Sequence, residues 1–240
     1  MFFDTHIHLK DTIPNYPCVN VSTVQSEWLS ILQISKSHPH IIPALGIHPW
    51  FVTDSFESQL VHLQNLLSVH PSAVLGEIGL DFSSQYRQSK LLQIEVFSQH
   101  LDMAVQFQRP LSLHIVKAHN EALSMLKGLN VLGVVHGFGS SPEVAKRYVD
   151  LGFKIGVNAI VCRDNAFRYH RLVRYVPLES LVLETDYPNV RLGSKDANIE
   201  DIALVAQSVA RIKNVSLQEV IQTTYNTAKY IFGNPHESLI

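Results

Sequence analysis

The sequence is poor in cysteine, and it has no long apolar run and no block of basic residues. Only Cys18 and Cys162 occur among 240 residues, too few and too far apart for a disulfide framework or a thiolate metal site. No stretch of about 18 apolar residues suggests a membrane span, so no membrane partner is expected. The net charge is -2, which excludes the electrostatic footprint of a dedicated duplex-binding protein. Any contact with nucleic acid is therefore expected to be local to one site.

The sequence also lacks the features of a signal peptide and of a linker. No basic stretch precedes Phe2 and Phe3, and the acidic Asp4 follows at once, so a cytoplasmic location is expected. No repeat, low-complexity segment or Pro/Gly-rich stretch divides the chain. Barrels of alternating strands and helices reach this length as one domain, so a single domain over residues 1–240 is predicted.

Short β-rich runs alternate regularly with longer amphipathic segments. The runs, most of them almost continuously apolar, cover residues 2–6, 18–22, 41–45, 73–77, 111–115, 132–136, 153–157 and 181–185. Helical patterns cover residues 55–69, 87–108, 118–129, 142–151, 199–212 and 216–232. This alternation predicts an α/β fold, a single (β/α)8 TIM-type barrel. The alternative, an open doubly wound sheet, would need a Gly-rich turn after the first strand, where the sequence has two histidines.

These two histidines, His6 and His8, stand at the end of the first predicted strand. Alternate residues of a strand share a face and rise about 3.3 Å each, so the two rings project from one face roughly 6 to 7 Å apart. Two imidazoles at that spacing can close on one divalent cation. A His-x-His pair by itself also arises by chance on a half-exposed strand.

Other side chains of ligand type fall at or near the ends of later strands. They are Glu77, His114, His136 and Asp186. Barrels of this kind build their active sites from the C-terminal ends of their strands. Four imidazoles and two carboxylates suit zinc, manganese, cobalt or magnesium, and a carboxylate can bridge two ions about 3.5 to 4 Å apart. The six residues therefore predict a site for two divalent metal ions, although a lone strand-end histidine is more often a hydrogen-bonded core residue.

Such a site needs no serine or cysteine nucleophile, because two divalent ions activate water near neutral pH. Asp186 is the candidate acceptor of the proton from the attacking water, and Glu77 is the second candidate catalytic carboxylate. Asp4, Asp81 and Glu184 are interpreted as carboxylates that support the ligands.

The sequence resembles the TatD-like metal-dependent hydrolases of the amidohydrolase superfamily over nearly its whole length. The matching segments, in order, are Asp4-Thr5-His6-Ile7-His8, Gly46-Ile47-His48-Pro49, Gly76-Glu77-Ile78-Gly79-Leu80-Asp81, His114, His136-Gly137-Phe138 and Leu183-Glu184-Thr185-Asp186. The resemblance implies that His6, His8 and Asp186 hold one metal, that His114 and His136 hold the other, and that Glu77 bridges both. It also implies phosphodiester hydrolysis, since members are described as deoxyribonucleases.

The residues expected to face the substrate depart from the family pattern. Nuclease relatives usually carry a Cys-Arg-Asp run after the histidine of the fifth strand, whereas His114 is followed by Ile115, Val116 and Lys117. An arginine holds a phosphate bidentately, and Lys117 can replace it only as a point charge. Candidate substrate-binding residues are thus Lys117, His48 and Trp50. His48 could donate to a phosphate or order a turn, and Trp50 could stack on a base or pack its loop.

Several functions follow from this pattern. The first is a phosphodiesterase or deoxyribonuclease with DNA as substrate, and the second is a metal-dependent hydrolase of a small-molecule amide, lactone or phosphoester. A third is a non-catalytic barrel stabilised by metal. A barrel of the polymerase-and-histidinol-phosphatase type also begins with His-x-His, but it lacks the run from Gly76 to Asp81. The other histidines are expected on the surface; they are His38, His40, His62, His70, His100, His119, His170 and His236.

Overall fold

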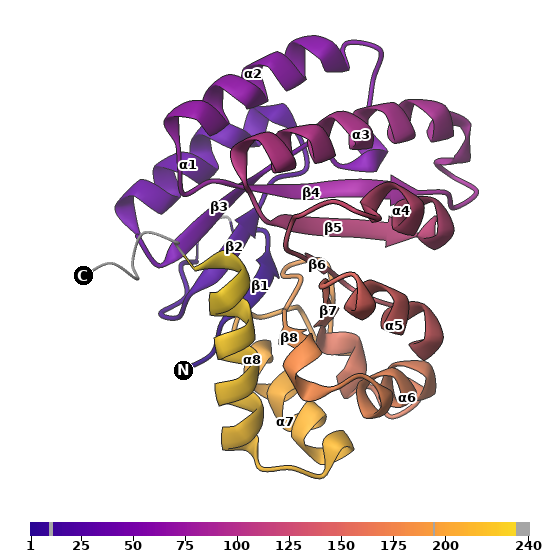
Figure 1. Ribbon diagram of the computed structural model, residues 1–240. Coiled ribbons are helices and arrows are strands. Elements are labelled where there is room, and N and C mark those ends of the chain that lie inside the picture. The colour runs from indigo at the N-terminus through magenta and orange to yellow at the C-terminus, as the bar shows by residue number, and fades with distance from the viewer. Residues whose placement is uncertain (10–11, 194, 234–240) are drawn as a thin grey trace. The chain divides into compact units, whose positions relative to one another are not determined.

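The protein is described from a computed structural model over residues 1–9, 12–193 and 195–233 (Figure 1). In this part of the chain the strands form one eight-stranded sheet, ordered β1 to β8 as in the sequence. Neighbouring strands are parallel, for example β3 with β4 and β7 with β8. The strands are β1 (Asp4–Ile7), β2 (Cys18–Val21), β3 (Ile41–Leu45), β4 (Val74–Asp81), β5 (Leu111–Val116), β6 (Gly133–Val135), β7 (Lys154–Val157) and β8 (Leu181–Leu183).

From β2 onward, α-helices connect successive strands, as the parallel arrangement requires. The α-helices are α1 (Trp28–Ser37), α2 (Phe56–Val69), α3 (Lys90–Phe107), α4 (His119–Leu126), α5 (Pro142–Asp150), α6 (Phe167–Tyr175), α7 (Asp201–Lys213) and α8 (Leu217–Phe232). The 3-10 turns are η1 (Gln25–Glu27), η2 (Pro49–Phe51), η3 (Arg87–Ser89), η4 (Ala159–Cys162) and η5 (Leu178–Ser180). Among the described residues, no helix combines the length and the apolar character needed to cross a membrane.

The chain forms two compact units. The first unit comprises Met1–Asn20 and His136–Ile240, and the second comprises Val21–Val135. In the second unit, α1 packs on β3, α3 packs on β4 and α2 lies against α3 (Figure 1). In the first unit, α5 packs on β7, and α8 packs on β8 and on α7. Every residue of β4 and β8 is buried, which explains why these strands are almost without polar alternation.

The eight predicted strands are present, with shifts at their ends. The largest shift is in β4, which was predicted to end at Glu77 but continues to Asp81. Glu77 therefore lies inside the strand, and Asp81 ends it. The glycines of the run from Gly76 to Asp81 hid this continuation, because glycine weakens a strand pattern in sequence. Here they are accommodated by an irregularity in the pairing of β4 with β5.

Two helices, α1 and α6, lie outside the helical patterns given by the sequence. In α6 only Leu172 and Val173 are buried, so the helix covers little of the core. In α1 only Trp28 and Ile31 are buried. Trp28 anchors α1, since its side chain is fully buried and its indole N–H donates to the carbonyl of Gly46 over 3.1 Å.

The expectation that His100 lies on the surface is wrong. His100 is fully buried in α3, and its Nδ1 donates to the carbonyl of Val96 over 2.8 Å. Its Nε2 accepts from the backbone N–H of Ile47 over 3.3 Å. Both ring nitrogens are thus used by the neutral imidazole. The polar partners allow a histidine to occupy a core position that its sequence context did not indicate.

Burial lowers the pKa of His100 from 6.5 to about 4, although the bond to Val96 opposes the shift. As the pH falls, the His100 imidazole is therefore protonated in the unfolded chain before it is protonated in the folded protein. The contribution of His100 to the free energy of unfolding is complete above about pH 6.5 and is lost between about pH 6.5 and 4. This loss of folding free energy should reach roughly 3 kcal/mol. Urea unfolding measures the free energy of unfolding at pH 7 and at pH 4.5. The decrease between the two pH values, called the acid loss below, should be smaller for His100→Gln than for the natural protein.

The matched control for this experiment is His70→Gln, a histidine at the end of α2 that is only half-buried. Its acid loss should equal that of the natural protein. An unchanged acid loss in His100→Gln would contradict the argument from burial.

Candidate metal centre

In the second unit, Glu77 lies between two histidines. Its Oε1 is 2.9 Å from Nδ1 of His114 and 3.2 Å from Nε2 of His48. Each of the three residues offers a ligand atom, and these atoms lie within 4.8 Å of one another. His48 and Glu77 are both 3% exposed. A buried carboxylate with two imidazoles is a donor set that suits zinc and other transition metals.

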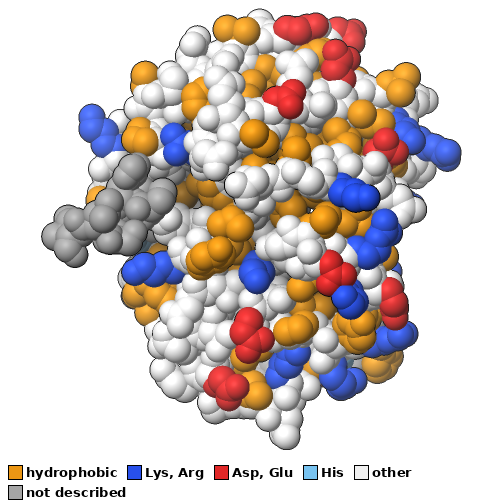
Figure 2. Space-filling view, viewed as in Figure 1, with side chains coloured by type: hydrophobic (Ala, Val, Ile, Leu, Met, Phe, Trp, Pro, Cys, Tyr) orange, Lys and Arg blue, Asp and Glu red, His pale blue; other side chains and the backbone are white. Residues whose placement is uncertain are grey.

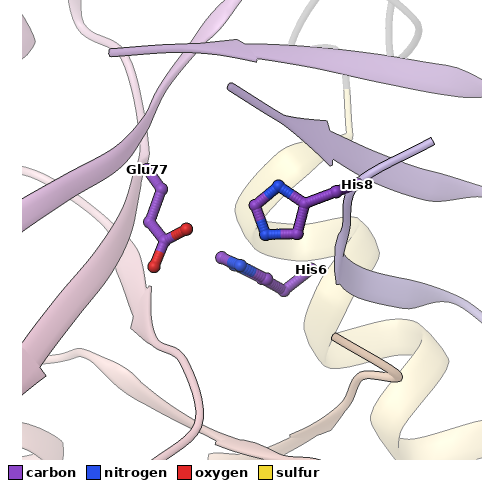
Figure 3. Close-up of side chains that lie close together, drawn as sticks. All are labelled: His6, His8 and Glu77. Carbon is purple, nitrogen blue, oxygen red and sulfur yellow. The ribbon is translucent and has the colours of Figure 1, made fainter. Parts of the chain in front are cut away.

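A bulge in β4 directs the side chain of Glu77. Leu75 pairs with Leu111 and Ile78 with Leu113, so two residues of β4, Gly76 and Glu77, face one residue of β5. A bulge of this kind bends the strand and re-aims a side chain. Figure 3 shows the Glu77 carboxylate extended away from its strand. Gly76 is needed beside it, because a Cβ there would lie 2.6 Å from that of Ser112.

Hydrogen bonds set the ring orientation of His48. Its Nδ1 accepts from the backbone N–H of Trp50 over 3.1 Å, at the start of η2. The backbone N–H of His48 donates to the carbonyl of Thr23 over 2.9 Å. In the neutral ring the proton is then on Nε2, which faces Glu77 as a donor. This arrangement favours His48 as a hydrogen-bond donor over His48 as a metal ligand.

Asp81 holds the other side of His114. Its Oδ2 lies 3.4 Å from Nε2 of His114 and accepts from Nε1 of Trp50 over 2.6 Å. Ser83 donates to Oδ1 over 2.8 Å. Burial would raise the pKa of Asp81, but the bonds from His114, Trp50 and Ser83 outweigh burial and hold it well below its usual range. A carboxylate in this position orients a ligand histidine and increases its basicity.

Trp50 and Lys117 occupy different surroundings. Trp50 is 44% exposed, and its ring stacks on Tyr86 with the centroids 4.9 Å apart. The Trp50 ring also lies edge-on to His48 and His114, at 4.7 and 5.7 Å between centroids. Lys117 follows β5 directly and is exposed, with a φ of 53°. Sequence reasoning missed Tyr86, because no motif marks a residue that only stacks on a neighbour.

In the first unit, the rings of His6 and His8 stand at the end of β1 (Figure 3). His6 stacks on His136 with the ring centroids 3.8 Å apart and the planes inclined by 8°. His8 meets His6 edge-on at 5.2 Å, and its Nε2 lies 3.8 Å from Oδ1 of Asp186. The fold thus brings together the four predicted ligands that belong to this unit.

Backbone bonds hold Asp186 beside the end of β1. Its N–H donates to the carbonyl of His6 over 3.0 Å, and the N–H of His8 donates to the carbonyl of Tyr187 over 2.8 Å. Asp186 has a φ of 53°, a conformation that costs a non-glycine residue energy and that is concentrated at functional sites. Asn189 donates to Oδ1 of Asp186 over 3.1 Å.

Two fully buried carboxylates support this group. Asp4 accepts from the N–H of His6 over 3.1 Å and from the hydroxyl of Thr185 over 2.6 Å. Burial raises the pKa of Asp4 to about 7. Glu184 accepts from the N–H of Gly137 over 2.5 Å and lies 4.0 Å from Nδ1 of His136. Burial raises the pKa of Glu184 to about 8. Glu184 thus lies beside the ring of a proposed ligand histidine, whereas Asp4 holds the backbone at His6 and Thr185.

A parallel α/β sheet ordered β1 to β8, with histidines and carboxylates at the ends of its strands, defines a class of protein: a metal-dependent hydrolase on a (β/α)8 barrel. The sequence profile of the family described as TatD related DNase matches residues 3–233. The chain therefore belongs to the TatD family, and it is an enzyme, a metal-dependent hydrolase of the TatD type.

Individual relatives agree with this assignment. A Haemophilus influenzae protein named "Uncharacterized metal-dependent hydrolase" is 29% identical over 260 residues, which cover 97% of this chain and 99% of that protein. The crystal structure of YjjV, a TatD homologue from Escherichia coli, has a TM-score of 0.87 at 26% identity, covering 98% of both chains. An amidohydrolase from Saccharomyces cerevisiae has a TM-score of 0.80 at 18% identity, over 96% of this chain and 99% of that one. The predicted (β/α)8 TIM-type barrel is confirmed.

Proposed function

We propose that the chain hydrolyses phosphodiester bonds of DNA with two divalent ions held by one set of six ligands. These ligands are His6, His8, Glu77, His114, His136 and Asp186. The proposal rests above all on the buried carboxylate of Glu77, whose Oε1 lies 2.9 Å from Nδ1 of His114. We also propose that residues 1–240 form a single domain, as barrels of this length do.

The donor set fits such ions. It contains only imidazole nitrogens and carboxylate oxygens, which zinc, manganese, cobalt and magnesium accept to different degrees. Two of the ligand histidines also have a carboxylate near the ring: Asp81 lies beside His114, and Glu184 lies beside His136. When bound, the ions would generate a nucleophile from water near neutral pH and neutralise charge on the phosphoryl oxygens.

The residues of the chain would perform the proton transfers and hold the substrate. The Asp186 carboxylate, fixed by Asn189 and by its own backbone bond to His6, accepts the proton of the attacking water and returns it to the leaving oxygen. His48 presents an N–H at Nε2, which can donate to a phosphoryl oxygen as well as to Glu77. Lys117 adds a positive charge after β5, and the exposed ring of Trp50 offers a surface for a base.

DNA as the substrate is supported by the description of the family, TatD related DNase. The second candidate is hydrolysis of a small-molecule amide, lactone or phosphoester. One observation favours it: His114 is followed by Ile115, Val116 and Lys117, so these positions contain no arginine that could bind a phosphate bidentately.

Metal removal combined with a substrate panel tests the proposal. The purified enzyme should contain two divalent ions per chain, and it should cleave single-stranded or duplex oligonucleotides and a generic phosphodiester. A chelator should abolish cleavage, and returning a divalent ion should restore it, because the ions supply the nucleophile. The chelated protein should also unfold several degrees lower, since bound metal stabilises only the folded state.

Other outcomes of this experiment decide against DNA. Two ions per chain and turnover of small esters or lactones without any cleavage of oligonucleotides would support the second candidate. Full activity after complete removal of metal would contradict the assigned ligands.

A further inference from the structure

An aromatic and basic cluster lies at the beginning of α6 in the first unit, and we call it the α6 cluster. It consists of the exposed Phe167 and Arg168 and the half-buried Tyr169. The Phe167 side chain is 76% exposed, although a large apolar ring normally seeks the core. Arg168 is exposed, and its guanidinium lies 5.7 Å from the centre of the Tyr169 ring. Over α5 and α6, hydrophobic side chains are interspersed with basic and acidic ones (Figure 2). The burial of α6 against the core gives no reason for this composition.

The α6 cluster lies against the loop that begins at the proposed ligand His136. A Cβ on Gly139, in this loop, would be 2.8 Å from the Tyr169 hydroxyl and 3.7 Å from Nη2 of Arg168. The lack of a side chain at Gly139 therefore lets Tyr169 and Arg168 approach the loop closely. His136 and the α6 cluster are thus joined by one short stretch of backbone.

The arginines of α6 differ in their partners. Arg171 pairs with Glu143, with 3.4 Å between Nη2 and Oε1. Among the residues that the structure describes, Arg168 has no ion pair with a carboxylate. Its guanidinium is held over a ring and beside a glycine, so its positive charge is available to an anion from outside the chain.

We propose that the α6 cluster binds the single-stranded nucleic acid that flanks the bond to be cleaved, with Arg168 on a backbone phosphate and Phe167 stacked on a base. This inference rests on the proposed function and extends it to the substrate strand. An arginine and an exposed aromatic ring side by side are the elements of a sequence-tolerant site for single strands, because each base has a face that can stack. Arg168 supplies the planar, bidentate phosphate contact that the residues after His114 lack.

The test compares Arg168→Gln and Phe167→Ala with the matched control Arg171→Gln. The substrates are a single-stranded oligonucleotide and bis(p-nitrophenyl) phosphate, which is too small to reach from the metals to a flanking site. Arg168→Gln and Phe167→Ala should each raise the KM for the oligonucleotide about tenfold. All three variants should keep kcat/KM for the small phosphodiester, and Arg171→Gln should keep both activities.

Salt dependence separates the two contacts within the α6 cluster. For binding of the oligonucleotide to metal-stripped enzyme, the slope of log K against log salt should fall in magnitude by about 0.7 in Arg168→Gln, because one phosphate contact is lost. The slope should stay unchanged in Phe167→Ala, since stacking releases no counterions.

The experiments distinguish DNA as the substrate from the α6 cluster as its binding site. If the natural enzyme neither binds nor cleaves oligonucleotides, the DNA substrate is wrong and the role of the α6 cluster is wrong with it. If the natural enzyme cleaves oligonucleotides but Arg168→Gln behaves like Arg171→Gln, DNA remains the substrate and the α6 cluster is not its binding site.

Discussion

Replacement of Glu77 by glutamine is expected to reduce hydrolysis at least a hundredfold. The carboxylate Oε1 contacts both His48 and His114. Its negative charge would stabilise the two bound cations. The amide keeps the shape but removes the charge, and its NH2 group would face the N–H of His48 donor to donor. Mutation of a residue that only orients a metal ligand lowers metal affinity or activity about 10- to 100-fold. Replacement of a ligand itself should lower them further.

Steady-state rates and metal content should be measured together for this variant. The matched control is Glu95→Gln, the same change at an exposed position of α3 in the same unit, and it should keep both properties. A Glu77→Gln enzyme with two ions per chain and full activity would remove Glu77 from the ligand set.

A methyl group at Gly156 is expected to destabilise the protein by about 3 kcal/mol and to lower its melting temperature by roughly 6 to 12 °C. Gly156 lies in β7, and a Cβ there would collide with the buried carboxylate of Glu184. Glu184 would have to move and release the N–H of Gly137, which lies in the loop that begins at His136. Thermal and urea unfolding of Gly156→Ala measure this effect.

A double-mutant cycle shows whether the collision is the cause. Glu184→Ala alone should destabilise the protein, because the N–H of Gly137 loses its acceptor. In the double variant the Gly156→Ala methyl group enters space that the carboxylate has left, so it should add little further loss. Simple additivity of the two changes would refute the contact between Gly156 and Glu184 as the source of the instability.

The sequence predicted the fold because strand and helix periods are local properties. Almost continuously apolar runs such as residues 41–45 indicate strands buried on both faces, and eight strand-like runs leave few topologies for a chain of this length. The predicted segments omitted α1 and α6 and ended β4 too early. The helix α6 buries only Leu172 and Val173, and β4 continues through glycines that a pairing irregularity accommodates.

The same reasoning identified the candidate ligands, because strand ends meet at one face of a barrel whatever their separation in sequence. His8 and Asp186 lie close together in the first unit, as do Glu77 and His114 in the second. Their assignment as metal ligands stays a proposal, and so does the substrate-binding role of His48, Lys117 and Trp50.

The absence of long apolar runs, of cysteine pairs and of a basic block, together with the order of its motifs, determined the class of this protein from sequence alone. Tertiary structure decided what each side chain does. It showed that His100 is a core residue, that Trp50 stacks on Tyr86, and that Arg168 approaches Gly139. These relations depend on contacts between residues remote in sequence, and no local period or motif records them, because a side chain's partners are set by packing.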